Sequence, residues 1–145
     1  MLTQKEYQKI VEKHSGKSPI IKDTFRAFFV GGLICTLGEI FRKTYLSAGL
    51  GKDMAGSATA ITLIFIASVL TAFGIFDRIG KYAGAGTLVP ITGFSNAVTS
   101  PAMEFKSEGM VPGTATKIFT VAGPVIVYGT LSSVIAGIIY ILFMR

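Results

Sequence analysis

The chain has few charged residues for its length. Only 15% of its 145 residues are Asp, Glu, Lys or Arg, whereas a soluble domain carries roughly a quarter. The charges also occur in short clusters, so that residues 54–76, 82–103 and 118–144 contain none. Uncharged helices of this length can cross a hydrocarbon core about 30 Å thick. The shortage of charge therefore argues against a soluble domain and predicts an integral membrane protein.

The residues that metal sites and catalytic centres need are also nearly absent. The chain has a single Cys, Cys35, and a single His, His14, which leaves no disulfide framework and no set of metal ligands. The Ser residues lack a plausible His base, and the glycine-rich stretch after Lys81 departs from the dinucleotide and phosphate-loop patterns. We therefore expect no enzyme activity, no cofactor and no metal.

Nucleic acid is not an expected partner, although the net charge is +6. No basic run is interleaved with aromatic residues, as a single-strand binder would need. Lys and Arg instead flank membrane spans, because cytoplasmic segments retain positive charge. Residues 1–23 form a basic arm in which 3–14 predict an amphipathic helix. This helix lies on the cytoplasmic membrane surface or against a partner, or it is a solvated arm that helps to fix orientation.

Residues 24–145 are expected to form an all-α membrane domain with three or four transmembrane helices. Its spans are predicted at about 24–41, 54–76 and 118–144. The first is the least regular, because Arg26 and Glu39 lie at the two edges of its uncharged centre. Arg26 can extend to the headgroups, and Glu39 can pair with Arg42 or Lys43, three and four residues further on.

Residues 82–103 are uncharged but unsuited to a continuous helix, because Pro90 and Pro101 are expected to interrupt them. Such a segment belongs where protein or water, rather than lipid, can satisfy its backbone. A full crossing would give four spans, whereas a segment that dips in and returns would give three. We favour the re-entrant form. Either topology places more Lys and Arg inside when the N-terminus is cytoplasmic.

Weak polar groups gather in this broken segment. Ser and Thr hydroxyls, an Asn amide and exposed peptide groups can replace part of a solute's hydration shell without holding it tightly. The alternative is that they only bond one another or nearby carbonyls. We favour a lining role for Asn96, and the candidates for lining or gating a pore are Pro90, Gly93, Ser95, Asn96, Thr99, Ser100 and Pro101. Glu104, Lys106 and Glu108 are candidates for a pore mouth, or are plain interfacial charges.

Three or four spans seldom enclose a pathway alone, so a transport function implies an oligomer. Small residues let helices approach closely in membranes. We expect the following small-residue faces to pack against other subunits: Gly31-Gly32, Ala55-Gly56-Ser57-Ala58, Gly129, Ser132-Ser133 and Ala136-Gly137.

Two stretches carry a resemblance to a known family. Residues 93–109, GFSNAVTSPAMEFKSEG, and 121–130, VAGPVIVYGT, closely resemble the stage V sporulation protein A (SpoVA) membrane proteins, in their AC/AE branch. The resemblance extends from the basic arm to the last span, and the arm is more similar to the AC than to the AE type.

The resemblance implies a function beyond what the residues show. The family is implicated in moving dipicolinic acid, as the calcium chelate, across the spore inner membrane during sporulation and germination. It implies a mechanosensitive type of channel component that acts with an AE-type membrane relative and a soluble AD-type cytoplasmic partner. Two other functions remain open: a secondary transporter subunit with Glu39 as its candidate coupling residue, and a non-conducting scaffold that docks the soluble partner.

Overall fold

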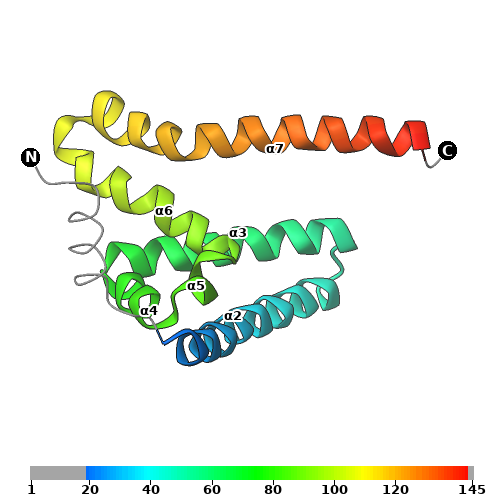
Figure 1. Ribbon diagram of the computed structural model, residues 1–145, viewed down its shortest axis with the longest axis horizontal. Coiled ribbons are helices and arrows are strands. Elements are labelled where there is room, and N and C mark those ends of the chain that lie inside the picture. Colours follow the sequence, from blue (N-terminus) through cyan, green and yellow to red (C-terminus); the bar gives the residue numbers. More distant parts are fainter. Residues whose placement is uncertain (1–18, 144–145) are drawn as a thin grey trace, which may run out of the picture.

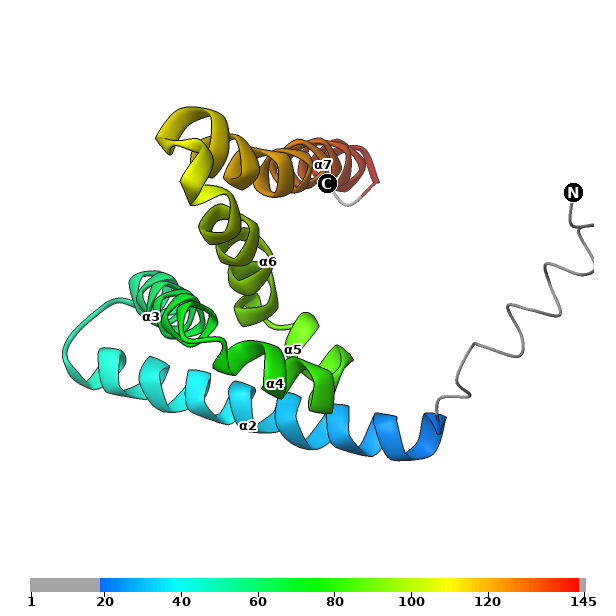
Figure 2. The same ribbon diagram turned by 90° about the vertical axis from the view of Figure 1, so that its left-hand side faces the viewer.

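The computed structural model describes residues 19–143, and every regular element in that range is helical. The predicted all-α fold is confirmed. The expected arm helix at 3–14 and His14 lie outside the described residues. In both views α6 lies between α7 and the pair formed by α2 and α3 (Figures 1 and 2).

The first two helices, α2 (Ile20–Ser47) and α3 (Lys52–Ala72), are joined by a tight turn. Gly49 adopts a positive φ of 92°, which only glycine accepts at low cost. The Gly49 N–H donates to the Leu46 carbonyl and the Leu50 N–H to the Tyr45 carbonyl. This is the Schellman pattern that satisfies the last carbonyls of a helix, and it reverses the chain within four residues.

The second span is shorter than the uncharged run that predicts it. α3 ends at Ala72, before the expected boundary at Phe76, because Gly74 turns the chain with a φ of 67°. A separate short helix, α4 (Ile75–Ala83), follows at once. It is amphipathic: Phe76 and Ala83 are buried, whereas Asp77, Arg78 and Lys81 are exposed.

The segment expected to be broken is broken, but not at both prolines. Gly84, with a φ of 52°, separates α4 from α5 (Ala85–Leu88), and Pro90 precedes α6 (Ile91–Glu104). Pro101 lies inside α6, so the prediction that it interrupts the segment is wrong. A proline removes one backbone donor, here the one that would serve the Ala97 carbonyl, and the helix continues through Glu104.

The path of this segment corresponds to the dipping form. α5 packs against α2, and α6 packs on α3 and runs back to the end of the molecule where α4 begins (Figure 1). Its 14 residues reach about 21 Å, too short for a hydrocarbon core of about 30 Å. A turn at Phe105–Glu108 and a π-helical turn at Met110–Ala115 connect α6 to α7 (Thr116–Phe143).

Within residues 19–143, three helical stretches are long and apolar enough to cross a membrane: Ile20–Ser47, Lys52–Ala72 and Met110–Phe143. They are not a parallel bundle. α3 and α7 lie along the long axis of Figure 1, whereas α2 is foreshortened there and extends fully across Figure 2. Because α2 crosses α3 obliquely, a wedge remains between them, and α4 and α5 lie in that wedge.

Two glycines allow α2 and α5 to approach each other closely. A Cβ on Gly86 would collide with the Ala27 backbone, and one on Gly31 would lie 3.2 Å from the Gly86 carbonyl oxygen. Two of the small residues expected to face other subunits therefore serve contacts within the chain: Gly31 packs on α5, and Ala55 is fully buried. At Gly31 the reason is that α5 needs the same close backbone approach that a partner helix would need.

Candidate functional site

Five polar side chains join α3 to α6 near the centre of the fold. This α3–α6 polar cluster consists of Ser68, Thr71, Ser95, Asn96 and Thr99. The Ser68 hydroxyl lies 2.9 Å from that of Ser95 and 3.1 Å from that of Thr99. Ser95 is 4% exposed and donates to the Ile64 carbonyl at 2.9 Å. Spacing of four residues places Ser95 and Thr99 on one face of α6.

The proton count gives the three hydroxyls a direction. A hydroxyl has one proton to donate, and Ser95 uses its proton on Ile64. Ser95 must therefore accept from Ser68, and Ser68 must accept from Thr99. The result is a chain of donors from Thr99 through Ser68 and Ser95 to a backbone carbonyl. Interhelical hydrogen bonds in membranes contribute about 0.6 kcal/mol each on average, so this chain fixes geometry more than it stabilises the fold.

Asn96 forms the other half of the cluster. The Thr71 hydroxyl lies 2.7 Å from the Ala67 carbonyl and 2.9 Å from Asn96 Oδ1. One proton cannot serve both acceptors. The arrangement is fully satisfied when the amide is turned over, so that Asn96 Nδ2 donates to Thr71 while Thr71 donates to Ala67. The Asn96 carbonyl oxygen is then free to accept a hydrogen bond from a solute or from water.

Asn96 also lines a pocket of about 270 Å³ between α4, α5 and α6. Asp77 and Lys81, one helical turn apart on α4, line the same pocket, and Thr87 and Leu88 contribute from α5. The pocket thus offers a carboxylate, an ammonium group and a neutral amide at the point where the broken segment turns. Groups of this kind can bind both charges of a small ionic solute.

The other predicted lining residues have different surroundings. Pro90 immediately precedes α6. Gly93 is buried so close to the Thr87 and Leu88 backbone that a Cβ there would collide with it. Ser100 is exposed, one turn beyond Asn96 and outside the cluster. Pro101 is half-buried within the last turns of α6. The structure thus brings Ser95, Asn96 and Thr99 together and leaves Ser100 apart.

The predicted mouth residues lie at the α6–α7 connection rather than at the pocket. Glu104 ends α6, and Lys106 and Glu108 belong to the following turn, where all three are exposed. Beside them the Lys117 ammonium lies 3.8 Å from the centre of the Phe105 ring. Gly113 is the point of closest approach, because a Cβ there would collide with the Phe105 carbonyl.

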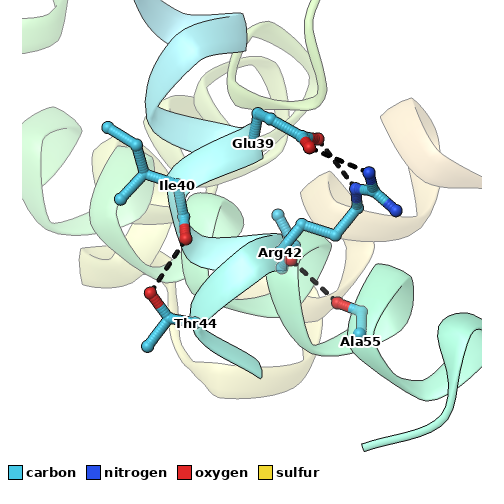
Figure 3. Close-up of polar contacts among 6 residues, drawn as sticks. Glu39, Ile40, Arg42, Thr44 and Ala55 are labelled. Atoms are coloured by element: carbon cyan, nitrogen blue, oxygen red, sulfur yellow. Dashed lines mark hydrogen bonds and ion pairs between the residues drawn. The ribbon is translucent and has the colours of Figure 1, made fainter. Parts of the chain in front are cut away.

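The two membrane-edge charges each have partners. Arg26 lies 3.8 Å from Asp23 and stacks over Tyr82 at 4.7 Å, which ties the start of α2 to α4. The predicted Glu39–Arg42 pair is confirmed: Arg42 Nε and Nη2 donate to the two Glu39 oxygens at 2.7 and 2.8 Å (Figure 3). Pairing lowers the cost of carrying both charges at membrane depth. One turn on, the Thr44 hydroxyl donates to the Ile40 carbonyl.

Comparison with known proteins assigns the chain to a family. Residues 23–139 match the SpoVAC/SpoVAEB sporulation membrane protein family. The chain belongs to this family. Stage V sporulation protein AC of Bacillus subtilis (strain 168) is 45% identical to it over 140 residues, which cover 96% of this chain and 93% of that protein. No solved structure matches the chain.

Four residues of the site in this SpoVA-family chain were missed by the sequence reasoning. Ser68 and Thr71 lie within an uncharged run and read as ordinary span residues. Asp77 and Lys81 read as charges that close a span. Their four-residue spacing would have placed them on one face of a short helix, but only the turn at Gly74 reveals that the helix exists.

Proposed function

We propose that the chain is a membrane subunit of a channel that carries dipicolinate, as its calcium chelate, across the spore inner membrane. The family assignment supports the coarser statement of a sporulation membrane protein. The observation that carries the proposal is the pocket at the broken segment, where Asn96 is joined by Asp77 and Lys81. A carboxylate and an ammonium group on one wall complement a solute that itself combines carboxylates with a cation.

The charge balance favours the chelate over the free acid. Dipicolinate is a dianion, and a pocket that offers one ammonium group beside a carboxylate and a neutral amide would leave much of that charge uncompensated. Calcium neutralises it. The Lys81 ammonium can then contact a carboxylate oxygen and Asp77 the calcium side, while the Asn96 amide exchanges hydrogen bonds with the remaining solute surface.

The proposal requires more than one chain. α7 packs on α6 only near its beginning, and its later turns expose apolar residues such as Leu131, Val134 and Ile138. The small residues Gly129, Ser133 and Gly137 recur every four positions on that free helix, the spacing that permits close helix packing in membranes. We propose that further copies or an AE-type membrane relative pack there, and that a soluble AD-type partner binds from the cytoplasmic side, on which we also place the N-terminus.

Gating by membrane tension follows if the open assembly occupies more membrane area than the closed one. The re-entrant segment is a suitable moving part, because Pro90 separates two short helices that pack on different long helices, α5 on α2 and α6 on α3. A widening between α2 and α3 would pull α5 away from α6 at Pro90.

The test is the release of dipicolinate from germinating spores that carry single substitutions in this chain. Asn96→Leu should slow release about fivefold, the rate equivalent of roughly one lost hydrogen bond, while membrane levels of the protein stay normal. Ala97→Leu, an exposed neighbour on α6, is the matched control and should release normally. Wild-type release from the Asn96 variant would rule out this pocket as the path.

A further inference from the structure

A second cavity, separate from the polar pocket, lies in the wedge between α2 and α3. Its volume is about 380 Å³, and its walls come from both long helices and from α4, α5 and α6. Two of its lining residues are polar, Thr87 and Thr92, and the Thr87 hydroxyl already donates to the Gly84 carbonyl. Water needs two to four polar partners in such a space, so this lining does not hold water.

The cavity is elongated and open on one side. On α2 it follows one helix face from Val30 through Leu37 to Phe41, a distance of about 16 Å. Leu33 and Leu37 line it and are each still 51% exposed, so the opening runs along α2. At its far end the Tyr45 hydroxyl lies 2.7 Å from that of Thr62 and holds the two helices together.

We propose that this cavity binds one acyl chain of a bilayer phospholipid. α2 and α3 are both long and apolar enough to span the membrane, so the opening along α2 faces hydrocarbon. An empty space of this shape would forfeit the dispersion contacts of every residue around it. A narrow slot about 16 Å long fits an extended hydrocarbon chain better than a side chain from a neighbouring subunit, which would fill only one end.

The bound chain would lie directly against the solute pocket. Phe76 and Thr87 line both cavities, and they are 5% and 1% exposed. They are therefore a shared wall with no room to move unless one of the two cavities changes. An acyl chain in the wedge pushes Phe76 and Thr87 towards Asn96 and Lys81. When the acyl chain leaves, these two side chains can move back towards the wedge. This coupling rests on the proposed function; the binding site itself does not.

The binding site is tested on the purified full-length chain, without any flux measurement. The protein is extracted in mild detergent with phosphatidylglycerol present and analysed by native mass spectrometry, and a second sample is labelled with a phospholipid that carries a photoreactive group in the middle of its acyl chain. The expected result is one retained phospholipid per chain, with photolabel on the cavity face of α2 and α3, including Leu33 and Leu70.

A matched pair of substitutions separates the cavity from general lipid contact. Val30→Phe fills the slot and should lose the retained phospholipid, whereas Val134→Phe makes the same change on exposed α7 and should keep it. If Val30→Phe fails to fold, Leu33→Phe provides a second filling variant at a half-exposed position.

Three results would overturn the proposal: no phospholipid retained by the wild-type chain, retention unchanged in a folded filling variant, or photolabel no denser in the wedge than on α7. A neighbouring chain in the slot would give the first result together with disulfide cross-links between subunits that carry Leu33→Cys in a Cys35→Ala background. If the proposed solute path is wrong, lipid retention stays intact and only the dipicolinate-release experiments give a contrary result.

Discussion

The Asn96 side-chain amide on α6 lies 2.9 Å from the Thr71 hydroxyl on α3 and also faces the pocket formed by α4 and α5. The same residue therefore fixes the helix contact and presents a polar group to the pocket. The sequence allowed two roles for the polar residues of the broken segment: lining a path, or bonding to other groups of the protein. Different residues take each role. Ser95 and Thr99 bond within the protein, whereas Asn96 retains a free acceptor.

This division predicts which positions on α6 contact water. In a Cys35→Ala background, a cysteine at position 96 should react quickly with a water-soluble thiol reagent, whereas one at position 95 should be protected. The reason is that Ser95 is 4% exposed and faces α3. The measurement is mass-spectrometric labelling of the protein in membranes. Equal protection at both positions would point to a packed helix with no aqueous pocket.

The hydroxyl chain predicts energetic coupling between Ser68 and Ser95. Their single alanine variants should each weaken the fold, and the double variant should show a coupling of about 0.6 kcal/mol, with an upper limit near 1.7 kcal/mol. The measurement is a double-mutant cycle by denaturant unfolding in micelles. Ser57→Ala is the control, because Ser57 bonds only the Asp53 carbonyl of its own helix. Strict additivity of the Ser68 and Ser95 effects would contradict the bond.

The charges of α4 predict how substitutions in the pocket change the rate at which an ionic solute is released. Lys81→Gln and Asp77→Asn should each slow dipicolinate release, because each removes one charge that the chelate can contact. Arg78→Gln is the control: Arg78 lies on the same helix and is exposed, but it does not line the pocket. Exchanging the two charges, with Asp77→Lys and Lys81→Asp together, should restore part of the rate. Equal effects of all three neutral variants would indicate general surface charge instead.

The contact between Gly86 and Ala27 predicts that α5 tolerates no side chain. Gly86→Ala would force the α2 and α5 backbones apart, and overpacking of this kind costs about 1–3 kcal/mol or more. Gly32→Ala, on the same α2 region but with open space around its Cβ position, should be close to neutral. Thermal unfolding of the two purified variants gives the comparison. A Gly86→Ala protein as stable as the wild type would mean that α5 does not lie against α2.

The Glu39–Arg42 pair bears on the carrier alternative. Both Glu39 oxygens are occupied by Arg42, so this carboxylate is poorly placed to bind a coupling ion. Glu39→Gln should leave the rate and the gradient dependence of solute release unchanged. The measurement is release at several imposed proton and sodium gradients. Loss of gradient dependence in this variant alone would favour a secondary transporter.

Much of the architecture follows from composition and local chemistry. Uncharged runs longer than a membrane is thick mark the spans, and a run rich in Gly and Pro cannot be a continuous helix at that depth. The sequence therefore predicts an all-α membrane protein with a broken segment near Pro90. The predictions that are wrong are local: Pro101 is tolerated within α6, and the second span ends at Ala72, just before the turn at Gly74. Single prolines and glycines act through backbone geometry that neighbouring contacts can override.

The sequence by itself determined the membrane setting, the helical class, the family and the presence of polar groups at Ser95, Asn96 and Thr99. The tertiary structure decided which of these polar groups face one another and which face a pocket. That decision depends on where α4 and α5 fold back between α2 and α3, which brings Asp77 and Lys81 beside Asn96. Pairing across helices is a property of three-dimensional distance, and the same residues at the same spacing could have faced lipid had Gly86 not let α5 pack against Ala27.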